Sequence, residues 1–107
     1  MNLQTLTADV RAQTSQLATF GHTLKFDLED VGVIWVDARK DPPVVSNEDL
    51  DADCTLYFSG RALQEVMVAQ TMSPVLAVTL GEISFEGSKD VGERFLALMP
   101  EGDDDDA

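Results

Sequence analysis

The feature that most restricts the fold is the strict alternation in "HTLKFDLE", residues 22–29. Leu24, Phe26 and Leu28 alternate with charged residues. A period of two predicts a β-strand that buries one face and leaves the other in water. Sheets with one wet face are typically antiparallel and carry helices on the buried face. The segment therefore predicts an α+β fold built of one sheet and one helical layer.

The same kind of pattern predicts further strands. The segment "VIWVDA" follows a turn and is expected to return antiparallel to the first strand, although both of its faces are apolar. The next stretch, 39–53, holds two prolines and many turn-forming residues, so we expect a loop there with a short edge strand. The predicted strands are 22–29, 33–38, an edge strand around Val44 and Val45, 53–58 and 82–87.

Apolar residues at helical spacing predict four helices. Gly21 is the expected end of the first helix. Ser59 and Ser73 are expected N-caps of the next two, and Pro74 suits the first helical position. Gly81 is the expected end of the third helix, and Pro100 ends the last one. The predicted helices are 3–20, 60–69, 74–80 and 89–99.

Length and charge narrow the class of protein. A chain of 107 residues is one domain, which we place at 1–100, followed by an acidic tail at 101–107. The 20 acidic residues against 7 basic ones argue against nucleic acid and against anionic membrane surfaces as partners. The longest uncharged stretch, 66–80, is shorter than the ~20 residues of a membrane span and contains a proline.

The expected location follows from the N-terminus and the cysteine count. The first residues show no apolar core behind a basic start, so we expect no secretory signal. A single cysteine, Cys54, rules out an internal disulfide and suits a reducing cytoplasm.

The sequence offers little chemistry for catalysis. His22 is the single histidine and is interpreted as a surface residue at a strand entry, while Cys54 alternates with polar residues as a small buried hydrophobe. Asp49, Asp51 and Asp53 imitate the start of a calcium loop, but the required glycine and glutamate are absent from their positions. We therefore expect no enzyme activity, no metal site and no cofactor.

The second half of the chain holds more apolar side chains than a minimal sheet and helix layer needs. Two interpretations stay open: these residues fill the core, as helical stripes usually do, or some of them line a cavity for an apolar ligand. Flexible methionines suit the second interpretation. The residues concerned are Val66, Met67, Met72, Val75, Leu76, Val78, Leu80, Phe95, Leu96, Leu98 and Met99.

The second half of the chain carries several motifs in a fixed order. Asp53 leads a strand, Ser73 and Pro74 open a short helix, and the strand "GEISFEG" runs from Gly81 to Gly87. In this order and spacing, the segment resembles the sterol carrier protein 2 domain. The upstream segment "LKFDLEDVGVIWVD" is similar to the first hairpin of that family, so the resemblance covers roughly residues 20–99. One departure is that "VAQTMSP" lacks the glycine that the family often has before this proline.

The resemblance implies a five-stranded, mainly antiparallel sheet with helices on one face and an apolar tunnel between the layers. It further implies a non-catalytic protein that binds or carries lipids such as fatty acyl chains, sterols or isoprenoids, with the last helix acting as a lid. The residues expected to line the tunnel are Leu63, Val66, Met67, Met72, Val75, Leu76, Ile83, Phe85, Phe95, Leu98 and Met99.

An alternative function is an accessory interaction module with a vestigial cavity. One apolar face of "VIWVDA" would then be exposed and form a homodimer or partner interface. The residues expected at that interface are Val33 and Trp35.

Overall fold

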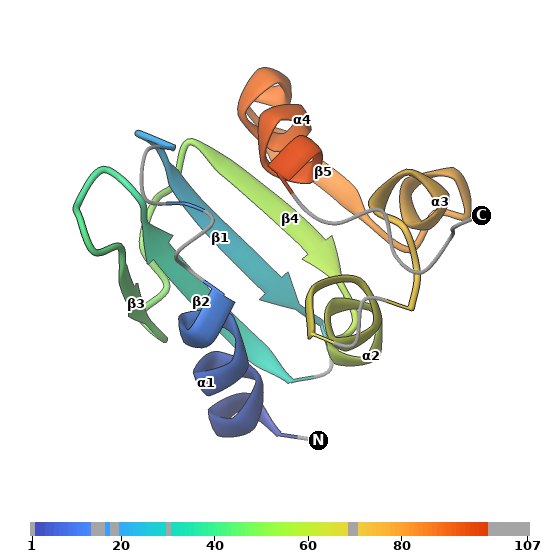
Figure 1. Cartoon of the computed structure of the whole chain (residues 1–107), viewed down its shortest axis with the longest axis horizontal. Coiled ribbons are helices and arrows are strands. Elements are labelled where there is room, and N and C mark those ends of the chain that lie inside the picture. The colour runs from blue at the N-terminus through green and yellow to red at the C-terminus, as the bar shows by residue number, and fades with distance from the viewer. Residues whose placement is uncertain (1, 14–16, 18–19, 30, 69–70, 99–107) are drawn as a thin grey trace.

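A computed structural model describes residues 2–13, 17, 20–29, 31–68 and 71–98 of the chain. Within this part, five strands form one sheet in the order β3-β2-β1-β4-β5 (Figure 1). β1 and β4 are parallel, whereas the other neighbouring pairs are antiparallel. The prediction of a mainly antiparallel five-stranded sheet is confirmed. The strands are β1 (Thr23–Leu28), β2 (Gly32–Asp37), β3 (Val44–Ser46), β4 (Cys54–Phe58) and β5 (Ser84–Gly87).

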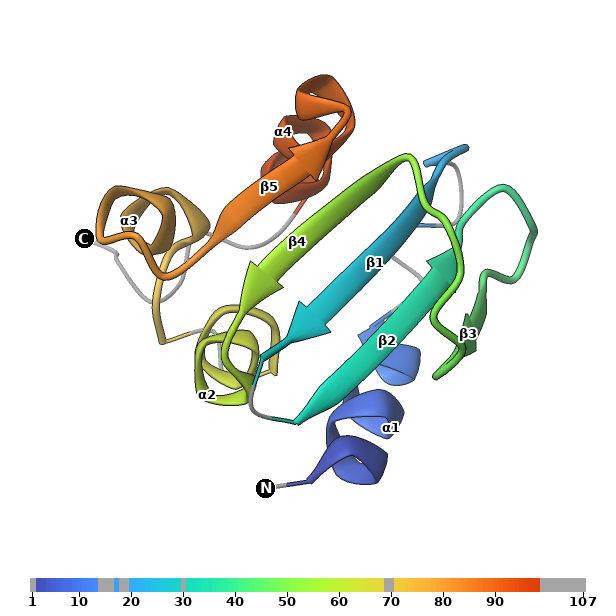
Figure 2. The same ribbon diagram turned by 180° about the vertical axis from the view of Figure 1, so that it is seen from behind.

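The helices lie mainly on one face of this sheet. Figure 1 shows α1, α2 and α4 in front of the strands, and Figure 2 shows the same helices behind them. α3 lies beyond the edge formed by β5 in both views. The helices are α1 (Leu3–Gln13), α2 (Gly60–Leu63), α3 (Pro74–Thr79) and α4 (Lys89–Leu98), with a π-helical stretch η2 (Gln64–Val68) after α2.

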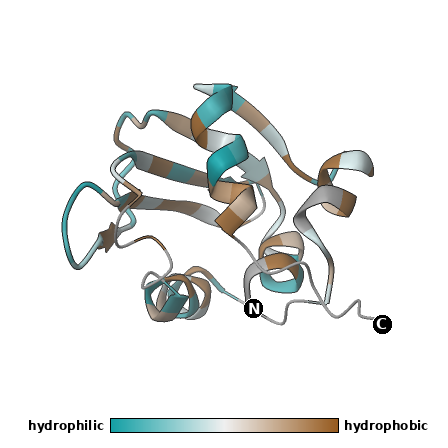
Figure 3. Ribbon diagram, turned by 45° about the horizontal axis from the view of Figure 1, so that its top comes forward, coloured by the Kyte–Doolittle hydropathy of each residue, from teal (hydrophilic) through white to brown (hydrophobic). Residues whose placement is uncertain are grey.

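The alternation along β1 separates core from surface as predicted. Phe26 lies opposite Ile34 of β2 and Leu56 of β4, and all three side chains are fully buried beneath the helices. Lys25 and Trp35 face each other on the opposite side of the sheet. Figure 3 shows mainly hydrophobic colours in the last turn of α4.

The predicted first helix, 3–20, is described as a helix from Leu3 to Gln13, which is α1. Residues 14–16 and 18–19 lie outside the described part, and Phe20, the last predicted residue, is not helical. Leu17 and Phe20 are still buried, and the Phe20 amide donates to the Leu17 carbonyl in a turn. Burial of these two side chains therefore reflects a turn that packs on the core. Gly21 follows with a positive φ of 81°.

Two helix starts and one helix end follow the predicted signals. Ser59 accepts a hydrogen bond from the Ala62 amide, and Ser73 accepts one from the Leu76 amide, which satisfies free N–H groups at each start. α3 ends in a Schellman motif at Gly81, whose φ is 77°. These short-range rules act on neighbouring residues and therefore hold without tertiary information.

The prediction of one regular helix over 60–69 was wrong in part. The helix continues as an α-helix only through Leu63 and then widens into the π-helical η2. The Glu65 carbonyl accepts hydrogen bonds from the amides of Thr71 and Met72, at 2.8 and 3.3 Å, and these contacts close the wide turn. Apolar spacing does not distinguish the two helix types because the pattern covers too few turns.

Candidate functional site

The layer between sheet and helices contains four of the residues predicted to line a tunnel. Leu63, Val66, Ile83 and Phe95 are buried and belong to the main hydrophobic cluster. The structure thus brings together residues from α2, η2, α4 and the segment before β5. This placement agrees with a role in the core and equally with a role against a bound apolar chain.

Four other predicted residues lie at the margin of that layer. Met72 and Phe85 are half-buried and pack against the hydrophobic cluster. Leu76 and Leu98 are 47% and 43% exposed. They lie outside the core of the described structure.

The structure does not describe the side chains of the remaining three predicted residues. Met67 lies within η2 and Val75 within α3, but their side chains are not described. Met99 lies outside the described residues. Their assignment to the tunnel stays a prediction.

α4 packs on the middle of the sheet through aromatic contacts. The ring centroids of Phe95 and Phe26 are 5.3 Å apart, and Phe26 makes an edge contact with Phe58 at 5.8 Å. Such pairs add to the free energy gained from burying their area. Close approach of the helix is also favoured by Gly92, where an added Cβ atom would lie 3.0 Å from the Cys54 sulfur.

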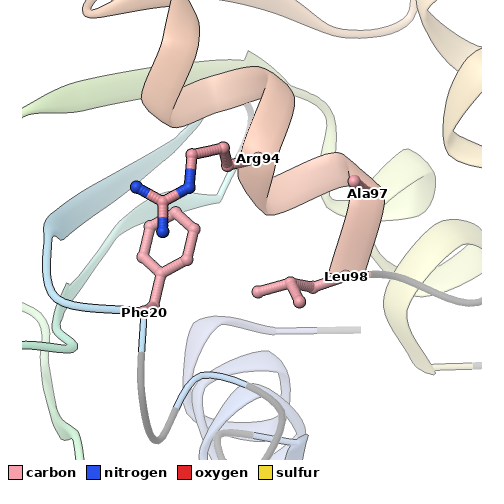
Figure 4. Close-up of a pocket in the computed structure, with 4 residues that line it drawn as sticks. All are labelled: Phe20, Arg94, Ala97 and Leu98. Carbon is pink, nitrogen blue, oxygen red and sulfur yellow. The ribbon is translucent and has the colours of Figure 1, made fainter.

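A pocket of about 270 Å³ opens beside the last turn of α4. Its lining consists of Phe20, Arg94, Ala97 and Leu98 (Figure 4). In this view the Arg94 guanidinium and the Leu98 side chain both extend toward the Phe20 ring. Leu98 was among the predicted residues, whereas Phe20, Arg94 and Ala97 were not.

Part of this pocket could be predicted from the sequence. Arg94 and Leu98 are four residues apart on a predicted helix and therefore share one face. Their contact with Phe20 joins segments more than 70 residues apart, which no local pattern indicates. Phe20 itself was interpreted as the end of the first helix.

Arg94 is held over the pocket by two contacts. Its guanidinium carbon lies 5.3 Å from the centroid of the Phe20 ring, a distance typical of a cation–π contact. Its Nη1 lies 3.1 Å from Nε2 of His22. Because a guanidinium group only donates hydrogen bonds, Nε2 must accept, which places the imidazole proton on Nδ1.

Asp53 holds the other side of the His22 ring. Its Oδ2 lies 3.4 Å from Nδ1 of His22 and accepts a hydrogen bond from the Thr23 amide at 3.0 Å. The Asp53 amide in turn donates to Oγ1 of Thr23. The hydrogen bond from the Thr23 amide lowers the pKa of the Asp53 carboxyl below its ordinary value, and His22 contributes in the same direction. Asp53, His22 and Arg94 thus form a chain of polar contacts from the residue before β4 to α4.

Asp53 also explains why residue 87, one of the positions on which the family resemblance rests, is a glycine. Gly87 has a φ of 94°, and a Cβ atom there would lie 2.7 Å from the Asp53 carbonyl oxygen. The same oxygen accepts a hydrogen bond from the Ser88 amide. Only glycine fits this approach between the start of β4 and the end of β5.

Comparison with known proteins identifies the family of the chain. Residues 3–100 match the model of the SCP-2 sterol transfer family. The chain belongs to this family. Among curated protein sequences, none matches the chain.

Solved structures share the fold of this SCP-2 domain at low sequence identity. The sterol carrier protein domain 2 of Helicoverpa armigera has a TM-score of 0.70 and 13% identity over 89% of this chain and 82% of its own. The sterol carrier protein-2 of Aedes aegypti in complex with palmitate has a TM-score of 0.65 and 18% identity over 94% of this chain and all of its own. A sec-alkylsulfatase from Pseudomonas sp. has a TM-score of 0.59 and 18% identity over 85% of this chain, which corresponds to 15% of the sulfatase.

On the outer face of the SCP-2 sheet, Trp35, which was predicted to lie in a homodimer interface, has a contact within the chain. The indole N–H of Trp35 donates to the Asp51 carbonyl at 3.0 Å, and Lys25 pairs with the Asp49 carboxylate at 2.8 Å. The loop after β3 therefore already contacts Trp35, and the predicted dimer through Val33 and Trp35 is not supported.

Three further features of the SCP-2 domain concern metal binding, membrane-spanning helices and the reactivity of the cysteine. Within the described part of the chain, no group of three or more His, Cys, Asp or Glu side chains is arranged to hold a metal ion. None of the described helices has the length and apolar character needed to cross a bilayer. Burial raises the pKa of the Cys54 thiol, which keeps the sulfur in its unreactive, protonated form.

Proposed function

We propose that this SCP-2 domain binds apolar lipids, such as fatty acyl chains, sterol-like or isoprenoid molecules, and carries them between membranes or between enzymes. The observation that carries the proposal is the pocket beside α4, whose lining by Phe20, Ala97 and Leu98 is largely apolar. The palmitate complex of the Aedes aegypti relative supports the same class of ligand.

The size of the pocket supports a role for α4 as a lid. Its 270 Å³ lies just below the range of about 300–1,000 Å³ of most ligand sites. A long acyl chain would therefore have to extend between the sheet and the helices, with α4 moving outward. We propose that the residues along this path are Leu63, Val66, Met67, Met72, Val75, Leu76, Ile83, Phe85, Phe95, Leu98 and Met99.

The energetics of such binding suit a carrier. Each methylene removed from water contributes ~0.8 kcal/mol, so ten of them contribute ~8 kcal/mol before the costs of association. This corresponds to a dissociation constant on the order of micromolar. A lipid that leaves a bilayer was already out of water, so its transfer to the protein is close to neutral and reversible.

We propose that the domain acts without catalysis, in the cytoplasm. His22 and Asp53 are engaged in holding Arg94, and the Cys54 thiol is buried, so these groups are occupied structurally. The single cysteine is compatible with a reducing compartment.

Native mass spectrometry of freshly purified protein tests the proposal. We expect a fraction of the protein to carry added mass that matches a lipid, and organic extraction should release that lipid for identification. Delipidated protein should then bind a fluorescent fatty acid at micromolar concentration. Protein without copurifying lipid that also fails to bind the fluorescent fatty acid would contradict the proposal.

A further inference from the structure

The pocket beside α4 combines an apolar lining with one cationic side chain, that of Arg94. From this combination we infer that Arg94 binds the carboxylate of a single-chain fatty acid, while the alkyl chain begins along Phe20, Ala97 and Leu98. The inference rests on the proposed function and adds to it a preference for an anionic head group.

The guanidinium group is fixed in place before any ligand arrives. The Phe20 ring supports one face of it, and Nε2 of His22 accepts a hydrogen bond from Nη1. Asp53 holds His22 through the opposite ring nitrogen. A side chain held in this way loses less conformational entropy on binding than a free arginine does.

Arg94 keeps hydrogen-bonding capacity for a ligand. A guanidinium group carries five N–H donors, and among the described residues one of them reaches His22. The others suit a carboxylate, which arginine binds with two parallel hydrogen bonds. Arg94 is an exposed residue on the pocket wall, so water and ligands can reach it.

The local charge separates this site from the rest of the acidic surface. The protein has a net charge of −13, which disfavours anions over most of its surface. Asp53 approaches Nδ1 of His22, whereas Arg94 approaches Nε2, so the imidazole ring lies between the carboxylate and the guanidinium. Among the described residues that line the pocket, Arg94 contributes a positive charge and none carries a carboxylate.

Equilibrium dialysis with radiolabelled hexadecanoate and hexadecan-1-ol, at about pH 8 where a carboxyl group is ionised, tests the inference. The two ligands share the alkyl chain and differ in head group. We expect wild-type protein to bind hexadecanoate about tenfold more tightly than the alcohol, the factor of one charge-assisted hydrogen-bonded contact. Arg94→Gln should remove this preference and leave the affinity for the alcohol unchanged, whereas Arg94→Lys should keep part of it.

The control is Lys89→Gln, which removes the same charge from the same helix at a position outside the pocket lining. It should keep the full preference. An equal affinity of wild type for both ligands, or a preference that survives in Arg94→Gln, overturns the inference and leaves the proposed function standing. Wild-type protein that binds neither ligand overturns both. Unchanged alcohol binding by Arg94→Gln shows that the variant is folded; a variant that fails to fold leaves the wild-type comparison and Arg94→Lys to decide.

Discussion

Gly92 of α4 lies so close to Cys54 of β4 that a Cβ atom at Gly92 would stand 3.0 Å from the cysteine sulfur. The same atom would lie 3.1 Å from Cδ1 of Phe85. Cys54 is fully buried. This contact limits how closely α4 can approach the sheet when residue 92 carries a side chain.

Gly92→Ala should therefore lower the free energy of unfolding by about 1 kcal/mol. Overpacking costs about 1–3 kcal/mol, and the better helix propensity of alanine offsets about 1 kcal/mol of that cost. Urea denaturation monitored by circular dichroism measures the difference. Glu93→Ala, on the exposed side of the same helix, is the control and should change stability little.

A double variant identifies the colliding atom. Cys54→Ala removes the sulfur, so Gly92→Ala should cost less in that background than in the wild type. If the costs of the two substitutions simply add, the sulfur is not what limits the approach of α4.

The single tyrosine offers a direct probe of the outer face of the sheet. The Tyr57 hydroxyl donates a hydrogen bond to the Glu86 carboxylate on β5, and this bond raises the pKa of Tyr57 to about 12. Ultraviolet absorbance of the phenolate should give a midpoint near that value in the folded protein. Glu86→Ala should move it toward the usual value of about 10.

The same pair makes a prediction about alkaline stability. A raised pKa stabilises the fold while the group is protonated, so this contribution is complete below about pH 10 and is lost as the pH rises through the folded value. In Glu86→Ala the loss of stability above about pH 10 should be smaller. An unshifted absorbance midpoint in this variant would show that Glu86 does not hold the phenol.

Acid stability should depend on Asp53. Its pKa is lowered, first by the hydrogen bond from the Thr23 amide, so its contribution is present above the ordinary value of about 3.9 and is lost as the pH falls through the folded value. Asp53→Asn should lower the free energy of unfolding at neutral pH by about 1 kcal/mol, since the carboxylate is half exposed and partly screened. The stability curves of the variant and the wild type should converge below about pH 4.

Thermal unfolding across this pH range provides the measurement. Asp51→Asn is the matched control, because Asp51 contributes its backbone carbonyl to Trp35 and that group survives the substitution. A constant gap between Asp53→Asn and wild type at every pH would mean that the charge of Asp53 contributes nothing.

Local sequence rules predicted much of the fold. The alternation of Leu24, Phe26 and Leu28 identified the buried face of β1, and the caps at Ser59 and Ser73 located two helix starts. Each of these features depends on residues that lie a few positions apart in the sequence. They failed where the backbone changed geometry within an apolar run, as in η2.

The candidate site was less predictable than the fold. His22 was interpreted as a surface residue at a strand entry, and its side chain is 35% exposed. The sequence did not predict that this ring contacts both Asp53 and Arg94, which lies 72 positions further along the chain. Arg94 itself stands among apolar residues of a helix whose last turn was expected to contribute only Leu98 and its neighbours. Contacts of this kind depend on how α4 and the turn before β1 are brought together, which follows from the packing of the whole sheet.

Leu98 should contribute to binding without contributing much to stability. It lines the pocket but is 43% exposed, so Leu98→Ala should change the free energy of unfolding by less than about 0.5 kcal/mol. Loss of apolar contact with the alkyl chain should weaken hexadecanoate and hexadecan-1-ol equally, by about three- to tenfold. Equal loss distinguishes this residue from Arg94, whose replacement should affect the acid alone.

Leu80→Ala, which removes an equally large exposed side chain outside the pocket lining, is the control in the same dialysis experiment. A comparable loss in Leu80→Ala, or a loss confined to the acid in Leu98→Ala, would show that the alkyl chain does not pass along the last turn of α4.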